Sequence, residues 1–275
     1  MMKRIALVAL PFAFALGALV IVSAQQTPPA PTSPAGAGSQ NRGPAAPTGP
    51  VKRLPNGQVD LSGVWQGGGP VGDIRMGLAK GETLPIRPEW QKIMDARMSK
   101  DDPEANCLPT GVPRRDPYPW RIVQADTHTF LLFEGNIHSY RQIFMDGRKH
   151  PADLDPTWYG HSIGWWEGNT MVVDTVGFND KFWFDFKGHP HTERLHIVER
   201  YTRRDFNTLV NQITIEDPGA YSRPFTVTFT AELAPPGDEL LEYICQENNQ
   251  DVEHIHGPTQ PGGDPERPLG TLKSR

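Results

Sequence analysis

The strongest constraint on the fold of this chain is an alternation of apolar and polar side chains with a period of two residues. The alternation is clearest from Phe225 to Leu233, where Phe225, Val227 and Phe229 are separated by threonines. Successive side chains of a strand point to opposite faces, so one face of such a strand meets a core and the other meets water. Runs of this kind recur along the chain with turn residues between them, which predicts antiparallel strands.

Two of the predicted connections have the composition of tight hairpins. One is centred on Gly168-Asn169, between strands at 161–166 and 171–176, and the other on Asp205-Phe206-Asn207. Further strands are predicted at residues 61–66, 121–124, 129–134, 140–145, 195–202, 208–216 and 240–246. About eight to ten consecutive short strands predict an all-β antiparallel meander that closes into a barrel or folds into a sandwich.

One short helix is predicted after the first strand, from Glu89 to Ser99. Pro88 favours the first turn of a helix because its backbone angle is already helical. The apolar residues of this segment recur at helical spacing along one stripe, which consists of Trp90, Ile93, Met94 and Met98. We expect this helix to cover an end or a flank of the sheet.

The first 24 residues have the pattern of a secretory signal peptide. Lys3 and Arg4 precede an apolar run, and the run ends in small residues at Ser23 and Ala24. Cleavage after Ala24 would release the protein into the periplasm or the extracellular space, while an uncleaved membrane anchor is the alternative. No later run is long and apolar enough to span a membrane.

The rest of the chain divides by composition. Residues 25–59 are rich in Pro, Gly and Ala and predict a disordered linker. Residues 60–249 are long enough for one β-barrel domain with a substantial core. Residues 250–275 predict a flexible tail. The net charge is −5 and the basic residues are scattered, which argues against a nucleic-acid partner.

Cys107 and Cys245 are the only two cysteines of the chain. In an oxidising compartment, two cysteines without CxxC spacing predict one disulfide bond. The alternative is two unrelated buried thiols, because sequence alone does not show that two residues are close.

Two resemblances to known proteins are visible. Gly63-Val64-Trp65, within Asp60–Trp65, resembles the Gly-x-Trp signature of lipocalins and related calycin barrels. That resemblance implies a lipocalin-like barrel plugged by the tryptophan at one end and open to a ligand at the other. The predicted helix departs from the lipocalin pattern, because lipocalins usually place theirs after the last strand.

The second resemblance is broader and is to a group of secreted bacterial proteins of unassigned chemistry. The motifs that carry it span most of the domain and include Cys107-Leu108-Pro109, Asp146-Gly147-Arg148, His150-Pro151, Asp155-Pro156-Thr157-Trp158, Gly160-His161-Ser162, Trp166-Glu167-Gly168, Val173-Asp174-Thr175, Gly177-Phe178-Asn179-Asp180, Pro190-His191 and Glu199-Arg200-Tyr201. It implies secretion but no activity.

Residues 146–200 hold five of the nine histidines and four of the seven tryptophans. A buried imidazole needs hydrogen-bond partners and an indole supplies apolar wall, so this crowding predicts a pocket. The first hypothesis is therefore a barrel that binds a small, partly apolar molecule. Its candidate ligand-binding residues are Trp158, Trp165, Trp183, His196, Arg200 and Tyr201.

The second hypothesis is an acid-base enzyme, such as a lyase, isomerase or hydrolase, with His161, Asp174 and His191 as its catalytic residues. Asp174 shares a strand face with Val172 and Val176, and a carboxylate on an interior apolar face has a shifted pKa. His161 on the neighbouring strand is then a candidate base oriented by Asp174. The alternatives are an outward face, or an ion pair of Asp174 with Arg200.

The third hypothesis is a metal- or haem-binding barrel. His189, His191 and Glu193 share a face in extended backbone and would present two imidazoles and a carboxylate, with His161 or His196 as a further ligand. The alternative is a polar loop leading into a strand. No cofactor fingerprint is present, so the identity of any cofactor stays open.

Overall fold

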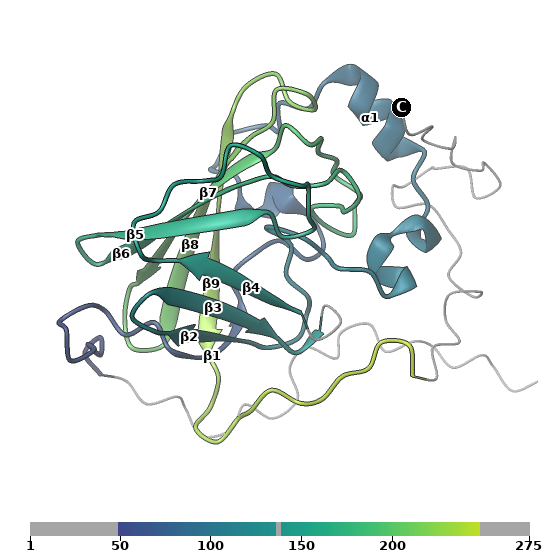
Figure 1. Cartoon of the computed structure of the whole chain (residues 1–275). Helices are drawn as coiled ribbons and strands as arrows, with labels where there is room; N and C mark the ends of the chain where they lie inside the picture. Colours follow the sequence, from purple (N-terminus) through teal and green to yellow (C-terminus); the bar gives the residue numbers. More distant parts are fainter. Residues whose placement is uncertain (1–48, 136–138, 248–275) are drawn as a thin grey trace, which may run out of the picture. The chain divides into compact units, whose positions relative to one another are not determined.

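A computed structural model describes residues 49–135 and 139–247 and shows a closed barrel of nine strands in meander order (Figure 1). The strands are β1 (Gly63–Gly67), β2 (Trp120–Gln124), β3 (His128–Phe133), β4 (Tyr140–Phe144), β5 (His161–Glu167), β6 (Thr170–Val176), β7 (His196–Arg203), β8 (Thr208–Glu216) and β9 (Phe225–Leu233). The predicted mostly-β barrel, with both hairpins and one short helix after the first strand, is confirmed.

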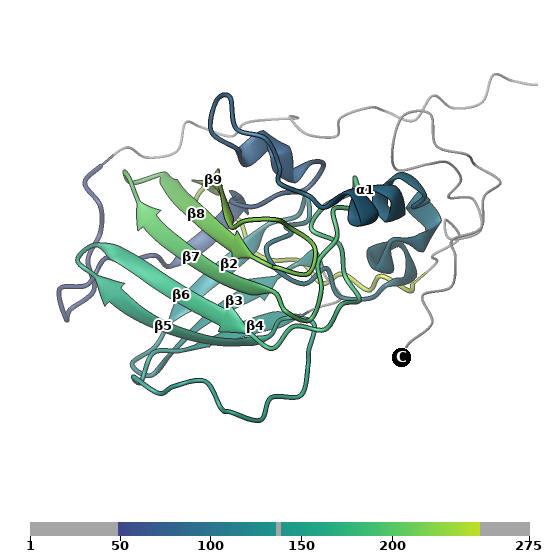
Figure 2. The same ribbon diagram turned by 90° about the horizontal axis from the view of Figure 1, so that it is seen from above.

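One strand pair is parallel, and the number of strands requires it. If all consecutive pairs of a nine-stranded meander were antiparallel, β1 and β9 would close in parallel, yet Trp65 faces Leu233 in an antiparallel pair. Among the nine described strands, the parallel pair is β4 with β5, where Ile143 lies opposite Ser162. Residues 145–160, here called the crossover segment, return the chain along the outside of the barrel to the start of β5 (Figure 2).

The barrel interior contains two apolar clusters. The open-end cluster is built mainly from Trp65, Trp120, Ile122, Leu131, Phe133, Ile143, Met171, Val173, Tyr201, Leu209 and Ala231. The covered-end cluster includes Ile74, Val112, Phe178, Phe182, Phe184, Leu195, Ile197, Ile213, Ile215, Tyr221, Phe225 and Val227. These residues alternate along the strands, so the period-two pattern identifies the inward face directly.

The covered end is closed by the long β1–β2 connection and by the loops after β6 and β8. The connection contains η1 (Ile74–Gly77), α1 (Pro88–Asp95), η2 (Ser99–Asp101) and η3 (Pro103–Asn106). Helix α1 lies against the β8–β9 loop, because the indole of Trp90 donates to the carbonyl of Gly219 at 2.9 Å. It ends at Asp95, earlier than the predicted Ser99, and Met94 and Met98 are buried.

A layer of buried polar groups separates the two clusters. On β7 and β8, Glu199 and Asn211 each stand between residues of the two clusters, and neither is exposed. Arg141 on β4 forms an ion pair with Glu199 and donates to Ser162 Oγ at 3.0 Å and Thr175 Oγ1 at 2.6 Å. One guanidinium therefore connects strands β4, β5, β6 and β7 across the parallel pair.

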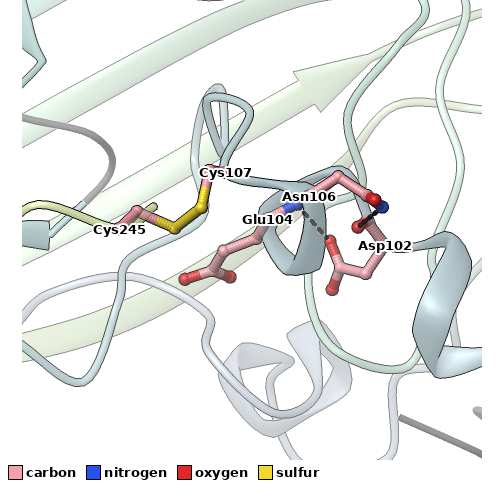
Figure 3. The surroundings of a disulfide bond; sticks show 5 residues. All are labelled: Asp102, Glu104, Asn106, Cys107 and Cys245. Atoms are coloured by element: carbon pink, nitrogen blue, oxygen red, sulfur yellow. Dashed lines mark hydrogen bonds between the residues drawn. A yellow bond between two sulfur atoms is a disulfide. The ribbon is translucent and has the colours of Figure 1, made fainter. Parts of the chain in front are cut away.

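The predicted disulfide bond between Cys107 and Cys245 is confirmed. Figure 3 shows it beside η3, where Asp102 accepts a hydrogen bond from the backbone of Glu104. The bond holds residues 234–247, here called the C-terminal strap, to the β1–β2 connection. The expected strand at 240–246 is wrong: this segment has no ladder partner within the described ranges and is fixed by the disulfide and by Leu241, whose N–H donates to Glu134 at 2.8 Å.

Two other sequence expectations concern the chain termini. Residues 49–59, which the composition assigns to the linker, are ordered against the barrel: Arg53 pairs with Val59 in a bridge, and Val59 is buried. The expected signal peptide, most of the linker and the tail from 250 onward lie outside the described residues. In the two described ranges, no helix has the length and apolarity needed to cross a bilayer.

Candidate functional site

A cavity of about 630 Å³ lies at the open end of the barrel. Its wall comes from β2, β3 and β5, from the β2–β3 turn, from the start of the crossover segment and from residues 54–58. The lining residues are Leu54, Pro55, Asn56, Gln58, Gln124, Ala125, Asp126, Thr129, Met145, Gly147, Gly164, Trp165 and Trp166. We call this space the open-end cavity; its volume is in the usual range for small-molecule sites.

The apolar part of the open-end cavity is made by two indoles and a thioether. Trp166 and Met145 pack on the open-end cluster, while Trp165 is 40% exposed. Gly164 makes this packing possible, because a Cβ at this position would lie 2.6 Å from the sulfur of Met145. The cavity therefore has a deep apolar side and an exposed aromatic rim.

The polar part of the open-end cavity includes groups that are free to bind. Gln124 is already used, because its amide accepts from the N–H of Leu61 at 2.6 Å and donates to Val59 at 3.2 Å. By contrast, the hydroxyl of Thr129 and the carboxylate of Asp126 have no hydrogen-bond partner within residues 49–135 and 139–247. A ligand with an apolar ring and a donor group would match both parts of the cavity.

A second cluster of chemically active side chains lies on the outer wall of the barrel. Met171, Val173 and Thr175 face inward on β6, so Asp174 faces outward, which is the outward alternative considered from the sequence. Asp174 and His161, the predicted catalytic pair, are linked through His150 from the crossover segment, which lies within hydrogen-bond distance of both.

The outer cluster is a chain of hydrogen bonds. His161 Nδ1 lies 2.8 Å from His150 Nδ1, and His150 Nε2 lies 3.3 Å from Asp174 Oδ1. On the other side, His196 Nε2 lies 2.9 Å from the same oxygen, and its Nδ1 is 3.9 Å from Glu216. The side chains of His150, Asp174 and His196 are partly exposed, at 20%, 24% and 36% respectively.

The ionised carboxylate determines the tautomers in this chain. Asp174 only accepts, so His150 donates from Nε2, and a neutral His150 then accepts at Nδ1 the proton of His161 Nδ1. Nε2 of His161 has no partner in the part of the chain that the structure describes. Burial alone would raise the pKa of Asp174, but its hydrogen bonds to His196 and His150 outweigh burial and lower it.

We expect His161 and His196 to titrate on opposite sides of the ordinary histidine pKa of 6.5. The hydrogen bond to Asp174 raises the pKa of His196, whereas burial, His150 and Arg148 lower the pKa of His161. Protonated His196 therefore stabilises the folded state at pH values below the pKa of the unfolded chain. This stabilisation is lost as the pH rises through the pKa of His196 in the folded state.

NMR titration of the imidazole protons measures the pKa values of His161 and His196. Asp174→Asn should return the pKa of His196 toward 6.5. Equal pKa values for His161 and His196 in the wild type would contradict this prediction.

His189 and His191 lie at the covered end and not in the outer cluster. His189 donates from Nδ1 to Asp185 at 2.6 Å, and both side chains are buried. His191 lies between Phe182 and Phe184, with ring centroids 3.8 and 5.2 Å away. Complete burial lowers the pKa of His191 to about 3, so this imidazole is neutral at physiological pH.

The predicted metal ligands His189, His191 and Glu193 do not gather their donor atoms in the described structure. The group that does is Asp73, Asp185 and His189, whose donor atoms lie within 4.8 Å of one another. Glu193 is exposed.

The remaining predicted ligand-binding residues are spread over the molecule. Trp165 lines the open-end cavity, whereas Trp158 packs against the covered-end cluster. The indole of Trp183 lies 4.7 Å from the guanidinium of Arg97. Arg200 pairs with Glu167 at 2.5 Å on the outer face, and Tyr201 is buried, where it donates to Glu199 at 2.7 Å.

Sequence reasoning missed Trp166, Met145, Thr129 and His150 as site residues. For Trp166 a signal existed, since it alternates with Ser162 and Gly164 on the inward face of β5. For His150 the signs were its membership of the His-rich stretch and of the His150-Pro151 motif, and neither indicated its partners. No family model matches the chain, and no curated protein or solved structure is significantly similar to it.

Proposed function

We propose that this protein binds a small, partly apolar molecule in the open-end cavity. The observation that carries the proposal is the lining: two indoles and a thioether on one side, and on the other a hydroxyl and a carboxylate that have no hydrogen-bond partner among the described residues. Indoles provide large rigid apolar area with little loss of side-chain entropy, and a few polar groups orient the ligand. The single charged lining residue is Asp126, which favours neutral or cationic ligands over anions.

The neutral fluorescent amine N-phenyl-1-naphthylamine is a suitable probe for this cavity. We expect it to bind with one site per chain and with enhanced emission. Trp165→Ala removes an aromatic wall worth about 1 kcal/mol, so it should weaken binding by about fivefold or more. Fluorescence titration measures the affinity.

The matched control is Tyr140→Ala, which removes another exposed aromatic side chain, 59% exposed, that does not line the cavity. We expect it to leave the affinity unchanged. Absence of saturable binding, or equal weakening by both variants, would contradict the proposal.

We also infer that the protein functions outside the cytoplasm. The disulfide bond between Cys107 and Cys245 supports an oxidising compartment, and the pattern of residues 1–24 supports export. Mass spectrometry of the protein recovered from a cell that expresses it should give an N-terminus at Gln25. Recovery of only the full-length chain from the cytoplasm would contradict this inference.

A further inference from the structure

The two imidazoles of His150 and His161 face each other in a way that suits a metal ion. Their Nδ1 atoms are 2.8 Å apart and their ring planes differ by 72°, so the two rings do not stack and meet through their nitrogen edges. His161 is fixed at the first position of β5, whereas His150 belongs to the crossover segment and not to the sheet. One ligand is therefore rigid and the other can adjust.

We propose that His150 and His161 bind one divalent transition metal ion, such as Zn²⁺, through their Nδ1 atoms. Two imidazole nitrogens at a tetrahedral zinc ion, each about 2.05 Å from it, are about 3.3 Å apart. The pair needs to open by only about half an ångström, a shift within reach of the crossover segment. Imidazole nitrogen is also the ligand that suits Zn²⁺, Cu²⁺ and Ni²⁺.

Asp174 supplies the outer support that such a site needs. A metal-bound histidine usually donates its other ring N–H to a carboxylate, which fixes the tautomer and makes the ligand nitrogen more basic. His150 already donates Nε2–H to Asp174 at 3.3 Å, so its Nδ1 carries the lone pair. On metal binding, the proton of His161 leaves Nδ1 and is carried by Nε2, which has no other partner among the residues that the structure describes. His161 changes its tautomer in this step, and the charge of its ring stays the same.

The group Asp73, Asp185 and His189 is the competing metal site, and its hydrogen bonds argue against it. Asp185 Oδ2 already accepts from Ile74 N at 2.5 Å and from His189 Nδ1 at 2.6 Å. Asp73 accepts from the backbone N–H of Arg75 at 2.9 Å and pairs with its guanidinium. A metal would have to break these bonds, whereas at His150 and His161 it replaces one proton between two nitrogens.

Isothermal titration calorimetry of the purified protein with zinc chloride tests the proposal. We expect one zinc ion per chain, with at least tenfold weaker binding in His161→Ala and in His150→Ala. Asp174→Asn should weaken binding by about 10- to 100-fold, as expected for the carboxylate behind a metal-bound histidine. The imidazole NMR signals of His150 and His161 should shift on zinc addition.

The control is His128→Ala, because the ring of His128 also lies beside Phe144, with centroids 5.2 Å apart, but His128 hydrogen-bonds to Thr127 instead of a histidine. We expect it to bind zinc like the wild type. Urea unfolding verifies that each variant is folded. Absence of zinc binding, equal weakening by His128→Ala, or loss of zinc only in His189→Ala would overturn the proposal, and none of these results bears on the open-end cavity.

Discussion

Replacing Glu199 by leucine is expected to lower the free energy of unfolding by about 3 to 5 kcal/mol, because it leaves buried arginines without their counter-charge. Arg141 forms an ion pair with Glu199, and a nitrogen of Arg115 lies 3.9 Å from it, with all three side chains buried. Burial alone would raise the pKa of Glu199, but the two arginines outweigh burial and lower it. Urea unfolding at neutral pH measures the loss.

A pair of glutamine variants separates this effect from a general effect of removing a carboxylate. Glu199→Gln keeps the side-chain shape and removes the charge inside the barrel, whereas Glu167→Gln removes a charge from the exposed pair with Arg200. We expect a large loss for Glu199→Gln and about 0 to 1 kcal/mol for Glu167→Gln. A loss below about 1 kcal/mol in both Glu199 variants would mean that the buried layer does not stabilise the barrel.

Replacing both Cys107 and Cys245 by serine is expected to lower the free energy of unfolding by about 4 to 5 kcal/mol. The bond joins residues 138 positions apart, and closing so long a loop restricts the unfolded chain strongly. In the folded state the same bond holds the C-terminal strap, where Tyr243 packs on Tyr118 with ring centroids 5.2 Å apart. Urea unfolding compares the double variant with the wild type.

Reduction provides the control for the cysteine variants. A reductant should lower the stability of the wild type to that of the serine double variant and leave the double variant unchanged. If the double variant unfolds at the same urea concentration as the oxidised wild type, the disulfide does not constrain the fold.

The barrel was predictable because its signal is local. Phe225 to Leu233 alternates strictly, and Gly168-Asn169 marks a two-residue turn, so strands and hairpins follow from neighbouring residues alone. The parallel pair of β4 and β5 was not predictable in this way, because it follows from how the ends of the meander meet. The C-terminal strap was not predictable either, since residues 240–246 are held by a distant cysteine and pair with none of the nine described strands.

The candidate sites were harder to predict because β6 is apolar on both faces. Val172 and Val173 point in opposite directions and both are buried, so the sequence does not reveal whether Asp174 faces the interior or the outside of the barrel. In the structure Met171 and Val173 point inward and belong to the open-end cluster, so Asp174 points outward. His150 comes to Asp174 only through the crossover segment, and no spacing rule relates those two positions.

Ligand-induced changes in the NMR signals of the indole N–H groups test the open-end cavity most directly. With N-phenyl-1-naphthylamine, we predict that the indoles of Trp165 and Trp166 and the amide of Thr129 shift together and saturate at one probe per chain. The indole of Trp183, which packs on Arg97 at the covered end, should stay in place. Shifts confined to Trp183, or no shift at Trp166 at saturation, would contradict binding in this cavity.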